Sequence, residues 1–337
     1  MDPSSDCPLE NPCCNKFLCT EYDYDILDNL KENEIYRWKV NLGPSLHQGR
    51  NAMVELIRYL AEEHAYRRTT VHLAIYMFDV FTSNNTVVAE RLNLVALTCF
   101  YVACKIEENE PCIPSTRTLC SFVENSLTPG DFIAFEVIVL NFFNWYVTIP
   151  TAATFLDFFA MHSLQMDDFM MASSATEMSE ASFAGFKREI IESSLEYLDV
   201  TLGHPKMSNV RPSKLAAACV AAARCLTPNV RAWNNHLTSV TGYNYQQIHG
   251  ICSVLVFDLK PLSTSPTLKV SSRKRSVTDS AYLSKSEDDS NTSDDDSCSS
   301  CSTCSSVEST SQTCSNSSGS ESGETCAKRQ RVSVDLK

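Results

Sequence analysis

The sequence is poor in glycine, which occurs only nine times in 337 residues. It also lacks long runs of the alternating apolar and polar residues that are typical of half-buried β-strands. Its apolar residues instead recur at helical spacing, with few glycine or proline interruptions. These absences predict an all-α protein. The length and the 43% hydrophobic content are sufficient for two domains of ordinary size.

Positive charge is also scarce, because 28 Lys and Arg residues stand against 41 Asp and Glu residues and the formal net charge is −13. Neutralisation of phosphates by Lys and Arg supplies most of the affinity of nucleic-acid binders. We therefore expect no nucleic-acid partner. A protein partner with a basic surface agrees better with this charge.

Membrane and catalytic patterns are missing as well. The most apolar stretch, between Asn93 and Lys105, is too short for a bilayer span, which needs ~20 residues, so no membrane contact is expected. No glycine-rich phosphate loop, His-Glu-x-x-His or Gly-x-Ser-x-Gly pattern occurs. We expect no enzyme activity and no cofactor. Because no secretory segment is predicted, the sixteen cysteines are expected to be free thiols.

The chain is organised around residues 92–108, which read LNLVALTCFYVACKIEE. Between Asn93 and Lys105, apolar side chains cover every face of a 3.6-residue period. A helix that is apolar all round is a buried helix, so this segment is expected to be the axis of a helical domain. It ends abruptly in the charged run Lys105-Ile106-Glu107-Glu108.

This ending resembles the third helix of a cyclin box, which finishes in Lys, an apolar residue and two Glu residues. Arg50 matches the arginine of the first-helix motif Met-Arg-Ala-Ile-Leu, and Asp79 matches the second-helix aspartate that pairs with it. Glu136 matches the fifth-helix glutamate that acts with the third-helix lysine. The sequence is identified as a member of the cyclin family, and KIEENE with NWYVTIPTAATFLDFF is most similar to its J-type members.

The resemblance implies an all-α fold in which two tandem five-helix cyclin boxes follow an N-terminal helix. The expected divisions are a disordered N-terminus at 1–20, the N-terminal helix and its link at 21–48, the first box at 49–149, the second box at 150–262, and a disordered serine-rich acidic tail at 263–337. The resemblance also implies that Arg50 and Asp79 form a buried structural ion pair. Removing one partner of such a pair costs ~3–5 kcal/mol.

The family resemblance implies a regulatory subunit that binds and activates a cyclin-dependent protein kinase in cell-cycle control. Such a subunit repositions the kinase C-helix, and the catalytic groups belong to the partner. The kinase-binding residues are expected to be Lys105 and Glu136, two charges set into apolar helices, together with Glu107 and Glu108.

Two alternatives remain open at this point. One is a transcription-type cyclin that partners an elongation kinase. The other is a cyclin-fold scaffold or general transcription factor that binds nucleic acid without a kinase and should show a basic face.

Substrate docking through the first helix of the first box is expected to be weakened. Where the family has Met-Arg-Ala-Ile-Leu followed by Trp, this chain has Gly49-Arg50-Asn51-Ala52-Met53 followed by Leu56. Each lost apolar group removes ~1.5–3 kcal/mol of possible burial. Only Met53 and Leu56 remain as anchors of this degraded substrate-docking patch.

Short motifs suggest further partners and a location. Lys31-Glu32-Asn33 spells a degron of the mitotic ubiquitin ligase, although it lies in the predicted N-terminal helix and such degrons are read from extended chain. Two basic clusters in the tail, Arg273-Lys274-Arg275 and Lys328-Arg329-Gln330-Arg331, are candidate nuclear import signals. We expect the protein in the nucleus, with a cytoplasmic fraction as a second location.

Three polar features receive structural interpretations. The Met-rich segment 164–182 is interpreted as a surface insertion. His72 lies on an apolar helix and is interpreted as a core histidine with satisfied hydrogen bonds rather than a ligand or a base. Cys298, Cys301 and Cys304 lack a fourth ligand at zinc spacing, so no metal site is expected.

Overall fold

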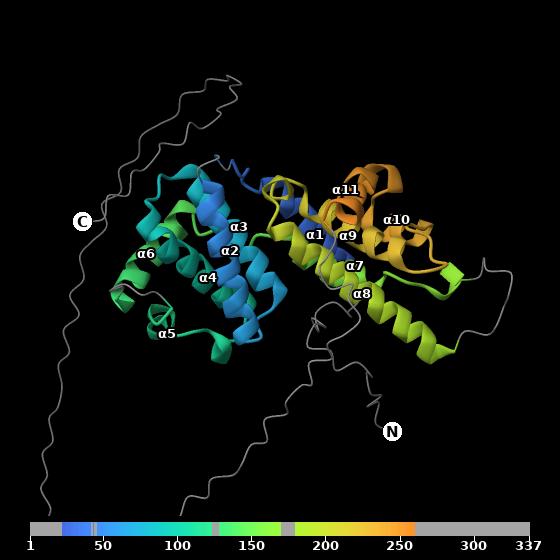
Figure 1. Ribbon diagram of the computed structural model, residues 1–337, viewed down its shortest axis with the longest axis horizontal. Helices are drawn as coiled ribbons and strands as arrows, with labels where there is room; N and C mark the ends of the chain where they lie inside the picture. Colours follow the sequence, from blue (N-terminus) through green and yellow to red (C-terminus); the bar gives the residue numbers. More distant parts are fainter. Residues whose placement is uncertain (1–21, 42, 44–45, 123–127, 170–178, 260–337) are drawn as a thin grey trace, which may run out of the picture. The chain divides into compact units, whose positions relative to one another are not determined.

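The computed structural model describes residues 22–41, 43, 46–122, 128–169 and 179–259. Every regular element in these ranges is a helix, as Figure 1 shows. The predicted all-α fold with two tandem helical bundles is confirmed. The predictions for residues 1–20 and for the tail at 263–337 fall outside the described residues.

Residues 22–41, which we call the N-terminal strap, precede the two bundles. The strap contains α1 (Asp23–Asn33) and the 3-10 helix η2 (Glu34–Tyr36). Its Leu27 is buried in the second hydrophobic core, and its Val40 is buried in the first. The strap therefore contacts both cores.

The first bundle is built around the predicted axis helix. Its elements are α2 (Leu46–Glu63), α3 (Arg68–Asn84), η3 (Ala89–Arg91), α4 (Leu92–Glu107), η4 (Glu110–Cys112), α5 (Thr116–Cys120) and α6 (Pro129–Phe142). Helix α4 contacts α2, α3 and α6, and its apolar residues from Leu94 to Cys104 are buried apart from the half-buried Tyr101. A capping box between Thr128 and Asp131 starts α6 at Pro129. Residues 123–127, between α5 and α6, lie outside the described residues.

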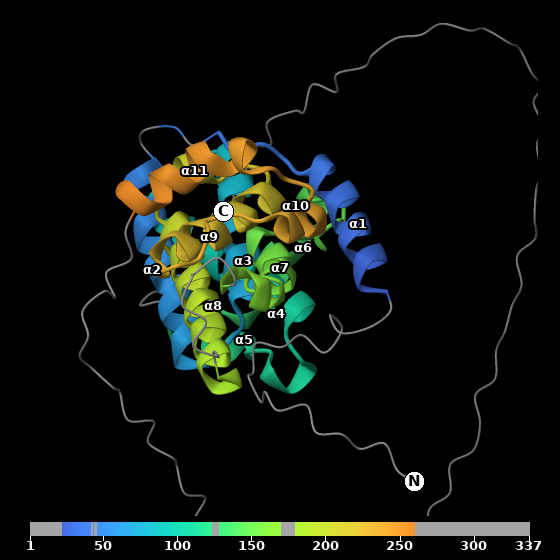
Figure 2. The same ribbon diagram turned by 90° about the vertical axis from the view of Figure 1, so that its right-hand side faces the viewer.

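The second bundle repeats this plan around a helix rich in alanine. Its elements are α7 (Ala152–Met161), η5 (Met166–Phe169), α8 (Glu180–Leu202), η6 (Pro205–Met207), α9 (Pro212–Leu226), α10 (Asn235–Thr241) and α11 (Tyr245–Phe257). Helix α9 contacts α7, α8 and α11, an arrangement that can be followed in Figure 2. Its small side chains, from Ala216 to Ala223, are fully buried and permit this close approach.

The interpretation of 164–182 as a surface insertion is wrong at both ends of the segment. Leu164 is only 3% exposed, and residues 166–169 form η5, which carries the nearly buried Asp168. Helix α8 already begins at Glu180. The physical reason is that Asp168 pairs with a buried arginine, Arg224 of α9, and this ion pair holds η5 against the bundle. Residues 170–178 lie outside the described residues.

Three general properties of the described residues bear on function. None of the described helices combines the length and the apolar character needed to cross a membrane. Every cysteine in the described ranges is a free thiol. These ranges also contain no group of three or more His, Cys, Asp or Glu side chains that could hold a metal ion.

Candidate functional site

Lys105 and Glu136 form an ion pair between the last turn of α4 and the middle of α6. Lys105 Nζ lies 2.6 Å from Glu136 Oε1 and 2.9 Å from Oε2, and it also lies 4.1 Å from the centre of the Tyr101 ring. The lysine side chain is 37% exposed and the glutamate side chain 14%. Partial burial lowers the pKa of Lys105. Its hydrogen bond to Glu136 and the negative charge of that carboxylate outweigh this effect, so the pKa of Lys105 is raised.

Apolar side chains flank this pair on the outer face of α6. Ile133 is 57% exposed and Val137 is 47% exposed. Positions 133, 136 and 137 share one face of a helix because residues three and four apart are neighbours. The result is a carboxylate held by a lysine and flanked by solvent-exposed aliphatic groups, a composition that suits contact with another protein.

Glu107 and Glu108, the other two predicted kinase-binding residues, make contacts within the chain. Glu108 Oε1 accepts hydrogen bonds from the backbone N–H of Arg67, at 2.7 Å, and from the hydroxyl of Thr70. It thereby stabilises the start of α3, where backbone N–H groups lack partners within the helix. Burial raises the pKa of Glu107, against the effects of Thr69 and Arg67. Kinase contact by Glu107 and Glu108 stays a prediction.

The structure brings Arg50 of α2 and Asp79 of α3 together in the interior. Arg50 Nε donates to Asp79 Oδ1 at 2.7 Å, and Nη2 donates to Oδ2 at 2.9 Å. The two side chains are 1% and 2% exposed. This bidentate geometry is the strong form of a guanidinium–carboxylate contact, and it joins α2 to α3 inside the first bundle.

The degraded substrate-docking patch contains little exposed apolar surface. Met53 is only 9% exposed and belongs to the first core, and Leu56 is half-buried against it. A side chain at Gly49 would begin only 2.7 Å from Leu92 Cδ1, so Leu92 fills the space beside that position. Docking through this patch stays a prediction.

The predicted degron Lys31-Glu32-Asn33 forms the last turn of α1. Asn33 donates to Asn29 Oδ1 at 2.8 Å and accepts a hydrogen bond of 3.2 Å from the hydroxyl of Tyr146. Lys31 and Asn33 are half-buried, whereas Glu32 is exposed. The tripeptide is therefore helical and held against the first bundle rather than extended.

Sequence reasoning missed two structurally important residues of the strap. Glu34 is buried and accepts hydrogen bonds from Ser213 N and Oγ at 2.9 and 2.7 Å, which places its charge at the start of α9. Arg37 donates to the carbonyl of Pro150, and its guanidinium lies 3.7 Å from the centre of the Tyr76 ring. Both residues belong to a segment of mixed charge, so no local pattern distinguishes them.

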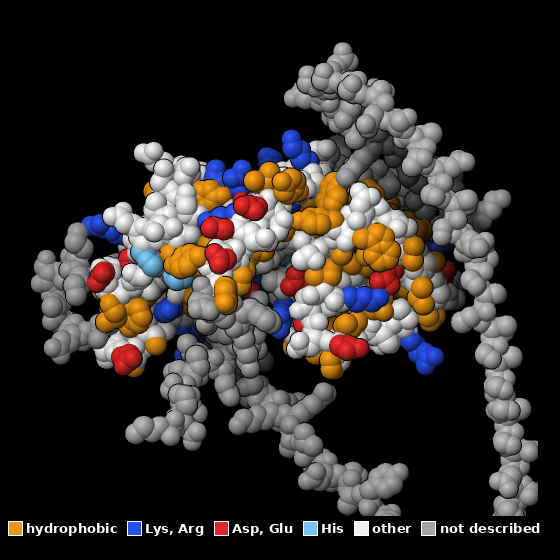
Figure 3. Space-filling view, turned by 180° about the vertical axis from the view of Figure 1, so that it is seen from behind, with side chains coloured by type: hydrophobic (Ala, Val, Ile, Leu, Met, Phe, Trp, Pro, Cys, Tyr) orange, Lys and Arg blue, Asp and Glu red, His pale blue; other side chains and the backbone are white. Residues whose placement is uncertain are grey.

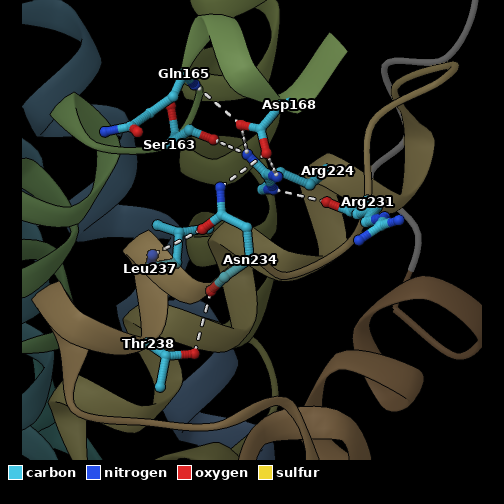
Figure 4. Close-up of polar contacts among 8 residues, drawn as sticks. All are labelled: Ser163, Gln165, Asp168, Arg224, Arg231, Asn234, Leu237 and Thr238. Atoms are coloured by element: carbon cyan, nitrogen blue, oxygen red, sulfur yellow. Dashed lines mark hydrogen bonds and ion pairs between the residues drawn. The ribbon is translucent and has the colours of Figure 1, made fainter. Parts of the chain in front are cut away.

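Sequence reasoning also missed a buried network in the second bundle, which Figure 4 shows around Arg224. Arg224 Nη1 and Nη2 donate to the two oxygens of Asp168 at 3.0 and 2.8 Å, and Nε donates to the carbonyl of Arg231 at 2.9 Å. Asn234 donates to Asp168 at 2.8 Å and caps α10. Burial raises the pKa of Asp168, but hydrogen bonds from Arg224, Gln165 and Asn234 together outweigh this effect, so the pKa is lowered. The sequence did contain a signal for this network, because Arg224 places a charge in an otherwise apolar helix.

Comparisons with known proteins agree with this architecture. The family described as "Cyclin, N-terminal domain" matches residues 25–148, and "Cyclin, C-terminal domain" matches residues 150–289. A viral cyclin structure from herpesvirus saimiri has a TM-score of 0.52 at 14% identity, over 70% of this chain and 99% of that chain. This structural likeness concerns the fold alone.

Relatives by sequence include J-type and A-type cyclins. Cyclin-J of Xenopus laevis is 28% identical over 236 residues, which cover 61% of this chain and 59% of that protein. The Cyclin-J-like protein of Mus musculus is 28% identical over 69% of this chain and 60% of that protein. Cyclin-A2-2 of Arabidopsis thaliana is 25% identical over 80% of this chain and 58% of that protein. The matched segments thus span less than two thirds of each relative. Because the two domain families together match most of its length, the chain belongs to the cyclin family.

Proposed function

We propose that this chain is the regulatory, activating subunit of a cyclin-dependent protein kinase of the cell-cycle class, and that the catalytic groups belong to the kinase. The observation that carries the proposal is the Lys105–Glu136 pair on a partly apolar surface. Both residues match the family's motif, and both side chains keep part of their surface exposed. Membership of the cyclin family supports the same conclusion.

The geometry suits recognition of a partner's backbone. The two hydrogen bonds from Lys105 fix the carboxylate of Glu136, and each of its oxygens keeps further lone pairs for N–H donors of another chain. Ile133 and Val137 on either side would bury apolar area and exclude water when a partner helix packs there. Water exclusion strengthens the charged contacts, so the pair would contribute more in the complex than in the free chain.

Affinity purification of the full chain from dividing cells, followed by identification of the bound kinase and an activity assay, tests this proposal. A cell-cycle kinase whose activity rises on binding is the expected result. An elongation kinase would favour the transcription-type alternative. Recovery of nucleic acid without any kinase would overturn the proposal in favour of a scaffold.

A nuclear location is part of the proposal, with a smaller cytoplasmic fraction. It is supported by the basic clusters Arg273-Lys274-Arg275 and Lys328-Arg329-Gln330-Arg331 in the sequence. Truncation after Pro261 should move a fluorescent fusion out of the nucleus and leave kinase binding intact. As a control, a deletion of residues 280–320, which keeps both clusters, should remain nuclear. A nuclear truncation, or one that loses the kinase, would contradict this assignment.

A further inference from the structure

A small cavity lies where the strap, α3 and the second bundle meet. Its volume is about 60 Å³, and its charged or titratable lining residues are Arg37, Arg50, His72, Tyr76 and Asp79. Ligand sites for drug-sized molecules measure ~300–1,000 Å³, so this space suits only water or one small ion. We call it the junction cavity.

Two residues of this lining each have a buried side-chain nitrogen without a hydrogen-bond partner. Arg50 uses Nε and Nη2 for Asp79, which leaves the two N–H groups of Nη1 buried and unpaired. His72 Nε2 is also buried without a hydrogen bond, and it lies 3.9 Å from Asp199 Oδ1, a residue outside the lining. Buried donors almost always find a partner, particularly when they are charged. The interpretation of His72 as a core histidine with satisfied hydrogen bonds is therefore incomplete.

Arg37 adds a positive charge to the lining of the cavity, and no carboxylate of the described residues forms an ion pair with it. Within the described ranges, Arg37 has no carboxylate oxygen within 4.0 Å, whereas Arg50 is already paired with Asp79. Burial lowers the pKa of Arg37, and Tyr76 and the charge of Glu34 oppose that effect only in part. The carboxylate of Glu34 is itself held by Ser213.

We propose that the junction cavity binds one small inorganic anion, held by the guanidinium groups of Arg37 and Arg50. Water molecules could satisfy the unpaired N–H groups, since ~30 Å³ is one water's share of liquid volume. Water would leave the half-buried guanidinium of Arg37 without a counter-charge in contact with it, whereas an anion supplies both the acceptors and the charge. This site is independent of the proposed kinase contact at Lys105 and Glu136.

Thermal unfolding of the full chain tests the proposal in solution. Sodium bromide is compared with sodium gluconate at equal ionic strength, because gluconate is too large for the cavity. Bromide should raise Tm in a saturable manner, as expected for a ligand of the folded state. Sodium phosphate in a third series distinguishes an oxyanion from a halide. An equal Tm in bromide, phosphate and gluconate would overturn the proposal.

Two variants distinguish anion binding in the junction cavity from general effects of salt on Tm. Arg37→Gln removes the unpaired charge and should abolish the anion-dependent increase in Tm. Lys39→Gln removes an exposed charge two residues away and should preserve that increase. An increase that survives Arg37→Gln would contradict the proposal.

X-ray diffraction from crystals of the wild-type protein grown in bromide locates the bound anion even if Arg37→Gln does not fold. An anomalous peak beside Arg50 Nη1 and Arg37 is expected. Density for water alone in the cavity, or bromide only at the outer surface, would overturn the assignment.

Discussion

Glu34 accepts hydrogen bonds from both the backbone N–H and the hydroxyl of Ser213, at 2.9 and 2.7 Å, although 179 positions separate the two residues. Ser213 lies in the first turn of α9, where N–H groups lack helical partners and the helix dipole favours a negative charge. Glu34 is only 6% exposed, so water contributes little to its solvation. This contact joins the strap to the axis helix of the second bundle.

Replacement of Glu34 by alanine should destabilise the protein by ~1.5–3 kcal/mol, the usual range for a hydrogen bond to a charged group. Glu34→Gln keeps an acceptor but loses the charge, and it should cost less. Urea unfolding of the full chain measures both effects. Glu32→Ala is the matched control, because Glu32 is exposed on the same strap, and its effect should stay within ~0.5 kcal/mol. Equal effects of Glu34→Ala and Glu32→Ala would show that the contact does not stabilise the fold.

Stability should depend on pH through Asp157 of α7. Burial, with a smaller contribution from the negative charge of Glu107, raises the pKa of Asp157 to about 7 against the opposing effects of Arg67 and Arg68. The folded chain therefore binds the proton more tightly than the unfolded chain. Asp157 therefore contributes to the stability of the fold below the pKa that it has in the unfolded chain, and this contribution is lost as pH rises through about 7.

The variant Asp157→Asn should remove this dependence. Its Tm should exceed that of the wild type at pH 8, and the difference should shrink toward pH 5. The variant Asp131→Asn should show the opposite pH dependence. Hydrogen bonds from Thr128 lower the pKa of Asp131, so the contribution of Asp131 to stability is lost as pH falls. Parallel pH profiles for the wild type and Asp157→Asn would contradict the assignment.

The features that could be predicted from sequence are those with a local signal. Helix α4 was predictable because apolar residues on every face require burial on every side. Lys105 and Glu136 were conspicuous because each charge interrupts an apolar helix. Arg224 gave the same kind of signal, but its partner Asp168 lies 56 positions away in a polar segment.

Glu34 and Arg37 had no such signal. Their importance depends on contacts with Ser213 and Pro150, which tertiary packing alone brings near. Acidic and basic residues in a segment of mixed charge look alike until the fold selects which ones are buried. For the same reason, the sequence did not indicate the unpaired Arg50 Nη1 of the junction cavity.

Binding of an Arg-x-Leu peptide at the degraded substrate-docking patch should be weaker than micromolar. Met53 is nearly buried, and Leu92 occupies the space beside Gly49, so few apolar groups remain for contact. Leu56→Trp should tighten binding, since added apolar area contributes ~25 cal/mol per Å². Fluorescence polarisation with a labelled peptide measures both, and a peptide with both motif residues replaced by alanine is the control. Micromolar binding by the wild type at this face would contradict the prediction.

The proposed recognition of Lys31-Glu32-Asn33 by a ubiquitin ligase requires the last turn of α1 to unwind. Glu34→Ala loosens the strap and should therefore shorten the half-life of the protein in mitotic exit. Replacing all three degron residues by alanine in the same background should restore the half-life. A chase experiment in synchronised cells measures both variants. A shortened half-life that the triple replacement does not restore would reflect misfolding and would exclude the degron.

The Lys105–Glu136 pair should be required for kinase binding and nearly neutral for folding. In the free chain the lysine is partly exposed, and such pairs contribute only ~0–1 kcal/mol to stability. At an interface, truncating one member of a buried charge pair costs ~2–5 kcal/mol in affinity, a weakening of roughly thirty-fold to several thousand-fold. Lys105→Ala and Glu136→Ala should each abolish coprecipitation and activation of the kinase.

The double variant separates one cooperative site from two independent contacts. Because Lys105 orients the carboxylate of Glu136, the loss of affinity in the double variant should be much smaller than the sum of the two single losses. Arg58→Ala and Glu55→Ala are the controls, since this pair on α2, 3.8 Å apart, joins a half-buried arginine to an exposed glutamate away from α4 and α6 and should not affect the kinase. Calorimetric titration with the purified kinase measures the affinities of the wild type, the two single variants, the double variant and the two controls. Circular dichroism confirms the helical fold of each variant. Wild-type affinity in either single variant, or full additivity in the double variant, would place the kinase contact elsewhere on the chain.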